Sequence, residues 1–259
     1  MAMRSDAQLQ AALAKVAIVL VEPKYAENIG AAARTAMNMG ISRLIVVRRE
    51  APDREKMLRM ATHHAVAVIE NMELYEELEP ALAPFSVVVG TTARQGRQRR
   101  PPNTPRVMVE KLLPLLAENQ VAILFGPEHR GLTNDDLKFC KFTSNIPTAD
   151  FTSLNLAQAV AIHCYELYHG LLFSGADKGF SPKLAAVPEL EGMYGHIEKL
   201  LREIEFLKQD QDRGESEYWM NSIRKFFGRQ ELQAKEVKMI RGFCKQFLRY
   251  EEHKHGEGP

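Results

Sequence analysis

The chain has 259 residues, of which 45% are hydrophobic and 26% charged, and its formal net charge is +1. This composition is typical of a globular protein with one large domain and a small appendage. The sequence has no apolar run of the roughly 18 residues that a membrane helix needs, and its first residues lack the layout of a secretion signal. Cys140, Cys164 and Cys244 form no CxxC pair, which indicates neither a disulfide framework nor a zinc site. We therefore expect a cytoplasmic protein with no membrane contact and no bound metal.

Short apolar runs alternate with segments of helical character along the first two thirds of the chain. The runs predict strands at Val16–Val21, Arg43–Val47, Ser86–Gly90 and Val121–Phe125, with a fifth at Phe142–Ile146. The segments between them predict helices at Asn28–Met39, Asp53–Ala61, Thr104–Ala117 and Ser153–Leu172. This alternation predicts an α/β fold built on a parallel sheet.

The composition changes after Leu172. Residues 173–188 are rich in Gly, Ser, Ala and Pro, which is typical of a linker. Beyond them, apolar residues recur at helical spacing, for example Ile197, Leu200, Leu201 and Ile204. The predicted organisation is a main domain at 1–172, a linker at 173–188 and a small all-helical extension at 189–259.

Three segments at predicted strand ends carry residues suited to ligand binding, because α/β sheets bind ligands at the carboxyl ends of their strands. Their sequences are NIGAAAR at 28–34, FGPEHRGL at 125–132, and IP at 146–147 followed by TSLN at 152–155. In the first, Asn28 is a candidate helix cap. In the second, two glycines flank a carboxylate, as in tight turns whose backbone approaches a ligand. Each segment alone is also typical of ordinary turns and helix caps.

The order and spacing of the three segments resemble the TrmH-like branch of the SPOUT methyltransferases, whose motifs are NxGxxxR, FGxExxG and IP followed by SLN. The segments VLVE at 19–22, VGTTAR at 89–94 and MNSIRKFF at 220–227 resemble the TrmJ-type tRNA methyltransferases within that branch. The resemblance covers nearly the whole chain. One departure is Pro127, which occupies a variable position of the second motif and removes a backbone donor there.

The resemblance implies a parallel sheet whose C-terminal part forms a deep trefoil knot, a homodimer with sites at the subunit interface, and S-adenosyl-L-methionine (SAM) as the methyl donor. A SAM pocket needs backbone hydrogen bonds and apolar walls more than charged side chains. By resemblance, the SAM-contacting residues are Thr91, Thr92, Ala93, Gly126, Ile146, Thr152, Ser153 and Leu154.

The implied reaction is transfer of a methyl group to a ribose 2'-hydroxyl, which requires alignment of the nucleophile and help with loss of its proton. The resemblance assigns the central role to Arg34. Because arginine titrates above about pH 12, electrostatic positioning suits it better than the role of a base. Asn28, Glu128, Ser153 and Asn155 are expected to orient Arg34, the ribose and its phosphate.

Two basic segments are candidates for contact with RNA. Arg94, Arg97, Arg99 and Arg100 crowd a loop directly after the candidate SAM segment, which suits phosphate binding. Residues 219–249 contain eight Lys or Arg against two acidic residues, which suits binding along a phosphate backbone. Their aromatics Trp219, Phe226, Phe227 and Phe243 are interpreted as core residues. The resemblance implies tRNA as the substrate, at nucleotide 32 of the anticodon loop.

Other functions remain open from the sequence. An NAD-binding or nucleotide-binding sheet is disfavoured, because neither a GxGxxG nor a GxxxxGK[ST] motif is present. Methylation of rRNA or of another tRNA site, and a knotted RNA-binding module without catalysis, stay as alternatives.

Overall fold

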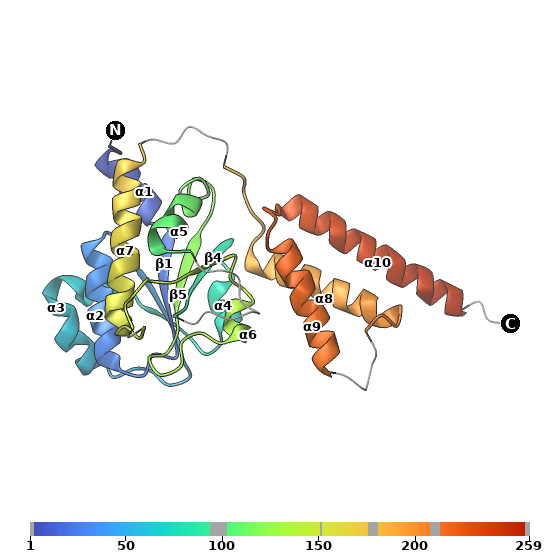
Figure 1. Ribbon diagram of the computed structural model, residues 1–259, viewed down its shortest axis with the longest axis horizontal. Helices are drawn as coiled ribbons and strands as arrows, with labels where there is room; N and C mark the ends of the chain where they lie inside the picture. The colour runs from blue at the N-terminus through green and yellow to red at the C-terminus, as the bar shows by residue number, and fades with distance from the viewer. Residues whose placement is uncertain (1–2, 94–102, 151, 176–180, 208–212, 257–259) are drawn as a thin grey trace. The chain divides into compact units, whose positions relative to one another are not determined.

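The computed structural model describes residues 3–93, 103–150, 152–175, 181–207 and 213–256 (Figure 1). The chain forms two compact units, residues 1–181 and 182–259. The division falls inside the segment predicted as a linker. None of the described helices combines the length and the apolar character that a membrane span requires.

The N-terminal unit is built on a parallel sheet of six strands in the order β3-β2-β1-β5-β4-β6, which confirms the predicted α/β class. The strands are β1 (Val16–Val21), β2 (Arg43–Val47), β3 (Glu73–Tyr75), β4 (Val87–Thr91), β5 (Val121–Phe125) and β6 (Phe142–Ser144). All residues of the central strands β1 and β5 are buried, as expected where helices cover both faces of a parallel sheet. The edge strand β3 was not predicted, because three residues of mixed exposure carry no clear strand pattern.

The helices of this unit are α1 (Asp6–Leu13), α2 (Ala26–Asn38), α3 (Arg54–Glu70), α4 (Leu78–Leu82), α5 (Pro105–Leu112), α6 (Asn134–Leu137) and α7 (Leu156–Phe173). The long helix α7 packs against α2 and α5, and against α1 (Figure 1). Asn155 caps α7, so this helix begins three residues later than predicted and Ser153 lies in the preceding segment. The predicted helix at Thr104–Ala117 ends earlier, at Leu112.

Helix α3 is longer than predicted and is interrupted at Thr62, whose backbone is non-helical with φ 60° and ψ 169°. Its two halves fold back on each other. Arg54 and Glu70, which a straight helix would separate by about 24 Å, form an ion pair of 3.1 Å.

The C-terminal unit consists of α8 (Val187–Glu203), α9 (Arg213–Phe227) and α10 (Ala234–Gly256). Its small core includes Met193, Tyr194, Leu207 and Val237. The guanidinium of Arg224 lies 4.3 Å from the centroid of the Tyr194 ring and makes two hydrogen bonds, of 2.5 and 2.6 Å, to the carboxylate of Glu191.

Two predictions about the side chains of the C-terminal unit need correction. Arg224 was counted among the cations available to RNA, but it is engaged inside the unit by Glu191. Trp219, Phe226 and Phe243 were interpreted as core residues, but they are 38%, 60% and 58% exposed. Phe227 does pack against the core.

Candidate functional site

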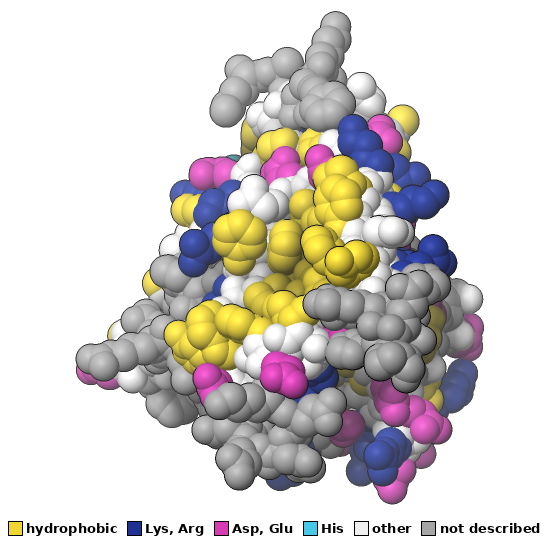
Figure 2. Space-filling view, turned by 90° about the vertical axis from the view of Figure 1, so that its right-hand side faces the viewer, with side chains coloured by type: hydrophobic (Ala, Val, Ile, Leu, Met, Phe, Trp, Pro, Cys, Tyr) yellow, Lys and Arg dark blue, Asp and Glu magenta, His cyan; other side chains and the backbone are white. Residues whose placement is uncertain are grey.

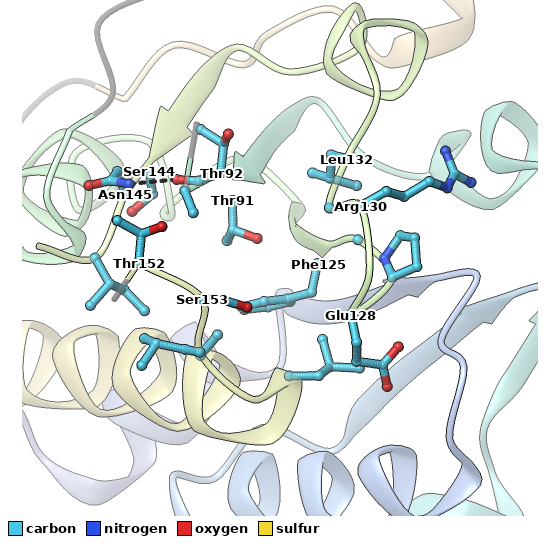
Figure 3. A pocket seen from close by; sticks show the side chains of 18 of the residues that line it. Thr91, Thr92, Phe125, Glu128, Arg130, Leu132, Ser144, Asn145, Thr152 and Ser153 are labelled. Carbon is cyan, nitrogen blue, oxygen red and sulfur yellow. Dashed lines mark hydrogen bonds between the residues drawn. The ribbon is translucent and has the colours of Figure 1, made fainter. Parts of the chain in front are cut away.

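A pocket of about 290 Å³ lies at the carboxyl ends of β4, β5 and β6 (Figure 3). Four chain segments line it, namely Thr91–Ala93 after β4, Phe125–Leu132 after β5, Ser144–Ile146 after β6, and Thr152–Leu154 before α7. Leu156, Ala159 and His163 of α7 complete the lining. Its position at the carboxyl edge of a parallel sheet is the one at which α/β proteins bind ligands.

The structure brings together all eight residues predicted to contact a cofactor, since each of them lines this pocket. They come from four segments that are separate in the sequence. Their role as cofactor contacts stays a prediction. Five of the lining residues provide large apolar side chains, namely Phe125, Leu132, Ile146, Leu154 and Leu156.

Hydrogen bonds fix the loop after β4 to the end of β6. The backbone N–H of Thr92 donates to the carbonyl oxygen of Ser144 at 2.9 Å, and the side-chain amide of Asn145 donates to the carbonyl oxygen of Thr92 at 2.8 Å (Figure 3). The backbone N–H of Asn103 donates to the carbonyl oxygen of Thr143 at 2.9 Å. Both ends of the segment 93–103 are therefore held by β6. Arg94, Arg97, Arg99 and Arg100 lie outside the described residues.

The turn after β5 depends on two glycines. A Cβ atom added at Gly126 would lie 2.3 Å from the backbone nitrogen of Leu132, so a side chain cannot be accommodated there. Gly131 has a φ of +64°, which favours glycine. Its N–H donates to the carbonyl oxygen of Pro127 at 2.8 Å and closes the turn. Pro127 has no backbone N–H, but the turn uses only its carbonyl oxygen, so the proline does not disrupt the turn.

Three of the predicted catalytic side chains form a hydrogen-bonded chain beside the pocket. The side-chain amide of Asn28 donates to Glu128 Oε1 at 2.6 Å, and the amide of Asn155 donates to Asn28 Oδ1 at 3.0 Å. Glu128 Oε2 accepts the backbone N–H of Lys24 at 2.8 Å. This chain ties together the first turn of α2, the loop after β5 and the N-cap of α7.

The expected capping role of Asn28 is wrong. Helix α2 begins at Ala26 with Tyr25 at its N-cap position, and this leaves Asn28 inside the first turn. The side chain of Asn28 is therefore free to reach across to Glu128 and Asn155.

The environment of Glu128 favours its ionised form. Burial alone would raise the pKa of the Glu128 carboxyl, but hydrogen bonds from the Asn28 amide and from the backbone N–H groups of Lys24 and Tyr25 outweigh it, so the pKa lies below its usual value. A carboxylate of lowered pKa is a weak proton acceptor. Its geometry suits positioning rather than base catalysis.

Arg34 lies apart from these residues. It is exposed on α2 and does not line the pocket. Among the described residues it forms neither an ion pair nor a hydrogen bond, so its guanidinium is available to a ligand. Ser153 lines the pocket directly.

Sequence reasoning assigned no role to His163, a buried residue that lines the pocket. Its Nδ1 lies 2.9 Å from the carbonyl oxygen of Ala159, and its Nε2 lies 2.9 Å from Ser144 Oγ. The ring packs edge-on against Phe125 with centroids 5.3 Å apart. The available signal was its spacing of seven residues from Leu156, which places both side chains on one face of α7.

Comparison with known proteins defines first a class and then a family. The model of the SpoU rRNA Methylase family matches residues 15–165, so the N-terminal unit is of the SpoU methylase class. The model of the tRNA methyltransferase TrmJ C-terminal domain matches residues 188–256. The tRNA (cytidine/uridine/adenosine-2'-O-)-methyltransferase TrmJ of Pseudomonas aeruginosa (strain UCBPP-PA14) is 34% identical over 243 residues, which cover 89% of this chain and 92% of that protein. The chain therefore belongs to the TrmJ family of SpoU methylases.

Further relatives support the same family. The tRNA (cytidine/uridine-2'-O-)-methyltransferase TrmJ of Sodalis glossinidius (strain morsitans) is 35% identical, with 89% of this chain and 90% of that protein covered. The crystal structure of TrmJ from Z. mobilis ZM4 superposes with a TM-score of 0.77 at 29% identity, covering 90% of this chain and 98% of that one. These findings confirm the resemblance inferred from the three motifs.

Proposed function

We propose that this chain transfers a methyl group from SAM to a ribose 2'-hydroxyl of tRNA, at nucleotide 32 of the anticodon loop, as a cytoplasmic homodimer. The observation that carries the proposal is the convergence of four motif segments on one pocket, with the chain formed by Asn28, Glu128 and Asn155 beside it. The curated relatives named as tRNA 2'-O-methyltransferases support tRNA as the substrate.

The residues of the pocket fit SAM. Its walls combine apolar side chains with backbone groups of tight turns, and the lack of a side chain at Gly126 lets the backbone of Gly131 and Leu132 pack against it. The carboxylate of Glu128 at the pocket is compatible with a cationic sulfonium. When bound, SAM supplies the methyl group. Thr91–Ala93, Gly126, Ile146 and Thr152–Leu154 would hold it.

The remaining predicted residues act on the ribose. A hydroxyl is a poor nucleophile until its proton is drawn away, and the positive charge of Arg34 would stabilise the developing alkoxide. Asn28, held by Glu128 and Asn155, would orient the sugar at the pocket rim, while Ser153 would contact it from within. Because Arg34 is exposed and outside the pocket of its own chain, a second protomer completing the site is part of the proposal.

The trefoil knot expected from the SPOUT class is also proposed for this chain. It is supported by membership of the SpoU family and by the order of the strands, in which β6 follows β5 in sequence but pairs with β4. In this arrangement the segment before α7 returns to the loop after β4, and both line one pocket.

The test of the catalytic assignment is Arg34→Ala in the full chain. Loss of the guanidinium removes charge stabilisation of the transition state, so kcat for methyl transfer to tRNA should fall at least ~100-fold. SAM affinity, measured by calorimetry, should change less than about twofold because Arg34 does not line the pocket. Arg54→Ala, which removes an exposed ion pair on α3, is the matched control. Full activity of Arg34→Ala would remove this residue from the mechanism.

Methylation of rRNA is the second candidate, because the matching family model is described by rRNA methylation. The same assay with rRNA and tRNA side by side separates the two. Transfer to rRNA alone would overturn the tRNA assignment while leaving the chemistry of the site in place.

A further inference from the structure

A buried histidine and a buried serine are hydrogen-bonded to each other at the wall of the pocket. Lys, Arg, Asp and Glu side chains lie at the surface, as on the face shown in Figure 2. Of the polar and charged residues that the structure describes, only Asn119, Thr143, Ser144 and His163 are buried, with His163 1% exposed. Both Ser144 and His163 line the pocket. An apolar residue would fill the space of His163 without the cost of burying polar atoms, so packing alone does not explain the pair.

The two nitrogen atoms of His163 have different partners. Nδ1 lies 2.9 Å from the carbonyl oxygen of Ala159, which can only accept, so Nδ1 carries the proton. No carboxylate is among the hydrogen-bond partners of this buried ring, which favours its neutral form. Nε2 therefore accepts the hydroxyl of Ser144 at 2.9 Å. With the edge-on contact to Phe125, these bonds hold the ring in one orientation.

The bond between Ser144 and His163 joins α7 to two segments of the pocket wall. The carbonyl oxygen of Ser144 accepts the backbone N–H of Thr92 at 2.9 Å, and the following Asn145 donates to the carbonyl oxygen of Thr92 at 2.8 Å. The segments Thr91–Ala93 and Ser144–Ile146 are thereby held together. They contain four of the eight residues predicted to contact the cofactor, namely Thr91, Thr92, Ala93 and Ile146.

We propose that His163 is a positioning residue for the methyl donor, which holds the segments Thr91–Ala93 and Ser144–Ile146 through the hydroxyl of Ser144 in the arrangement that binds SAM. The inference rests on the proposed function, because it takes SAM as the ligand from there. It goes further by giving a role to a residue outside the three motifs. Because His163 acts through Ser144 and offers a ligand almost no exposed surface, SAM affinity depends on it while the methyl transfer step does not.

Three substitutions in the full chain separate the two hydrogen bonds of His163. His163→Leu removes both. His163→Asn keeps the bond to Ala159, since Asn71 and Asn119 donate in the same way to the carbonyl oxygen four residues earlier, but its short side chain does not reach Ser144. His163→Gln brings an amide oxygen to the position of Nε2 and keeps an acceptor for the hydroxyl of Ser144.

Calorimetric titration with SAM measures the effect of each substitution. Without an acceptor for Ser144, a buried hydroxyl is left unpaired and the segments it anchors are released, so His163→Leu and His163→Asn should raise the Kd for SAM about 5-fold to 20-fold. His163→Gln should bind SAM within about threefold of the unchanged protein. In all three variants, kcat at saturating SAM and KM for tRNA should stay within about twofold of the unchanged values.

Two further variants separate positioning from folding. Cys164→Ala is the matched control, because Cys164 is the neighbouring buried residue of α7 and does not line the pocket. It should lower the Tm, as His163→Leu does, and leave the Kd for SAM unchanged. Ser144→Ala should raise this Kd, and its combination with His163→Leu should raise it no further than either change alone, because both remove the same bond.

The possible outcomes separate this inference from the proposed function. If His163→Leu lowers the Tm but binds SAM as tightly as the unchanged protein, His163 serves folding alone, and the inference is overturned while the function stands. Equal Kd values for His163→Asn and His163→Gln would show that the bond to Ser144 does not matter, which also overturns it. If His163→Leu does not fold, the comparison of these two variants decides in the same way. An unchanged protein that binds no SAM contradicts the proposed function and the inference with it.

Discussion

At the scale of single residues, His163 is the buried titratable group in closest contact with the pocket. The carbonyl oxygen of Ala159 can only accept a hydrogen bond, so Nδ1 of His163 carries the proton and Nε2 accepts the hydroxyl of Ser144. Burial lowers the pKa of His163 to about 4, so the ring is neutral at physiological pH. This neutral ring fixes Ser144 at the end of β6, and Ser144 and the following Asn145 hold the loop after β4.

The lowered pKa predicts a pH dependence of stability. Because the folded pKa is about 4 and the unfolded value about 6.5, the unfolded chain takes up the proton first as the pH falls. The stabilisation from the neutral ring is complete above about pH 6.5 and is lost towards pH 4, by up to about 3 kcal/mol. Urea unfolding of the unchanged protein and of His163→Gln at several pH values measures the difference. The exposed His64→Gln is the control. Equal loss of stability in all three proteins over this range would contradict the assignment.

The sequence motifs identified residues that the structure gathers at one pocket, whereas the predictions that depended on burial were partly wrong. The cofactor candidates lie at or just after the ends of β4, β5 and β6 and in the segment before α7, and the fold brings these segments together at the carboxyl edge of the sheet. The helical spacing of apolar residues does not say which face of a helix is buried. Helix α10 has two apolar faces, one with Val237 and Leu248 and one with Phe243, and only the first is packed. His163 was missed for a different reason: its hydrogen-bond partner Ser144 is 19 residues away in the sequence, and only the fold brings the two together.

At the scale of elements, the break in α3 holds Thr62 in a strained conformation. Its φ of 60° and ψ of 169° lie in a region that glycine occupies almost alone. The β-branched side chain makes this conformation costly by about 1–3 kcal/mol. The fold-back that it allows brings Arg54 to Glu70.

Replacing Thr62 by glycine should therefore stabilise the protein. The relief of strain exceeds the greater entropy of glycine in the unfolded chain, with a net gain of about 1 kcal/mol. Thermal unfolding should show a higher Tm for Thr62→Gly. Thr62→Ala keeps a Cβ atom and should give little of this gain. A Tm below that of the unchanged protein for Thr62→Gly would show that the backbone at this position is not strained.

Helices and strands could be predicted from the sequence where the pattern of apolar residues was long and regular. The four central strands are continuous apolar runs, and they were found within one residue of their ends. Short elements such as β3 and α6, of three and four residues, contain too few residues for a periodicity. The extension of α3 beyond Ala61 was missed because the strained residue Thr62 separates two half-helices.

At the scale of the whole molecule, the alternation of strands and helices predicted the α/β class, and the change of composition near residue 180 predicted a second unit. A trefoil knot does not follow from general packing rules, under which chains avoid threading. It entered only through the resemblance of the motifs. The homodimer was likewise expected only from the resemblance, because the sequence pattern of one chain does not show which of its surfaces contacts a second copy.

The central claim is that the pocket at the carboxyl edge of the sheet serves ribose methylation of tRNA. The most direct measurement incubates the purified chain with SAM and an unmodified tRNA transcript, followed by nuclease digestion and mass spectrometry of the fragments. The account predicts a single added methyl group on the ribose of nucleotide 32, absent with Arg34→Ala. A methyl group on a base, or an unmodified tRNA after incubation with folded and SAM-bound protein, would contradict it.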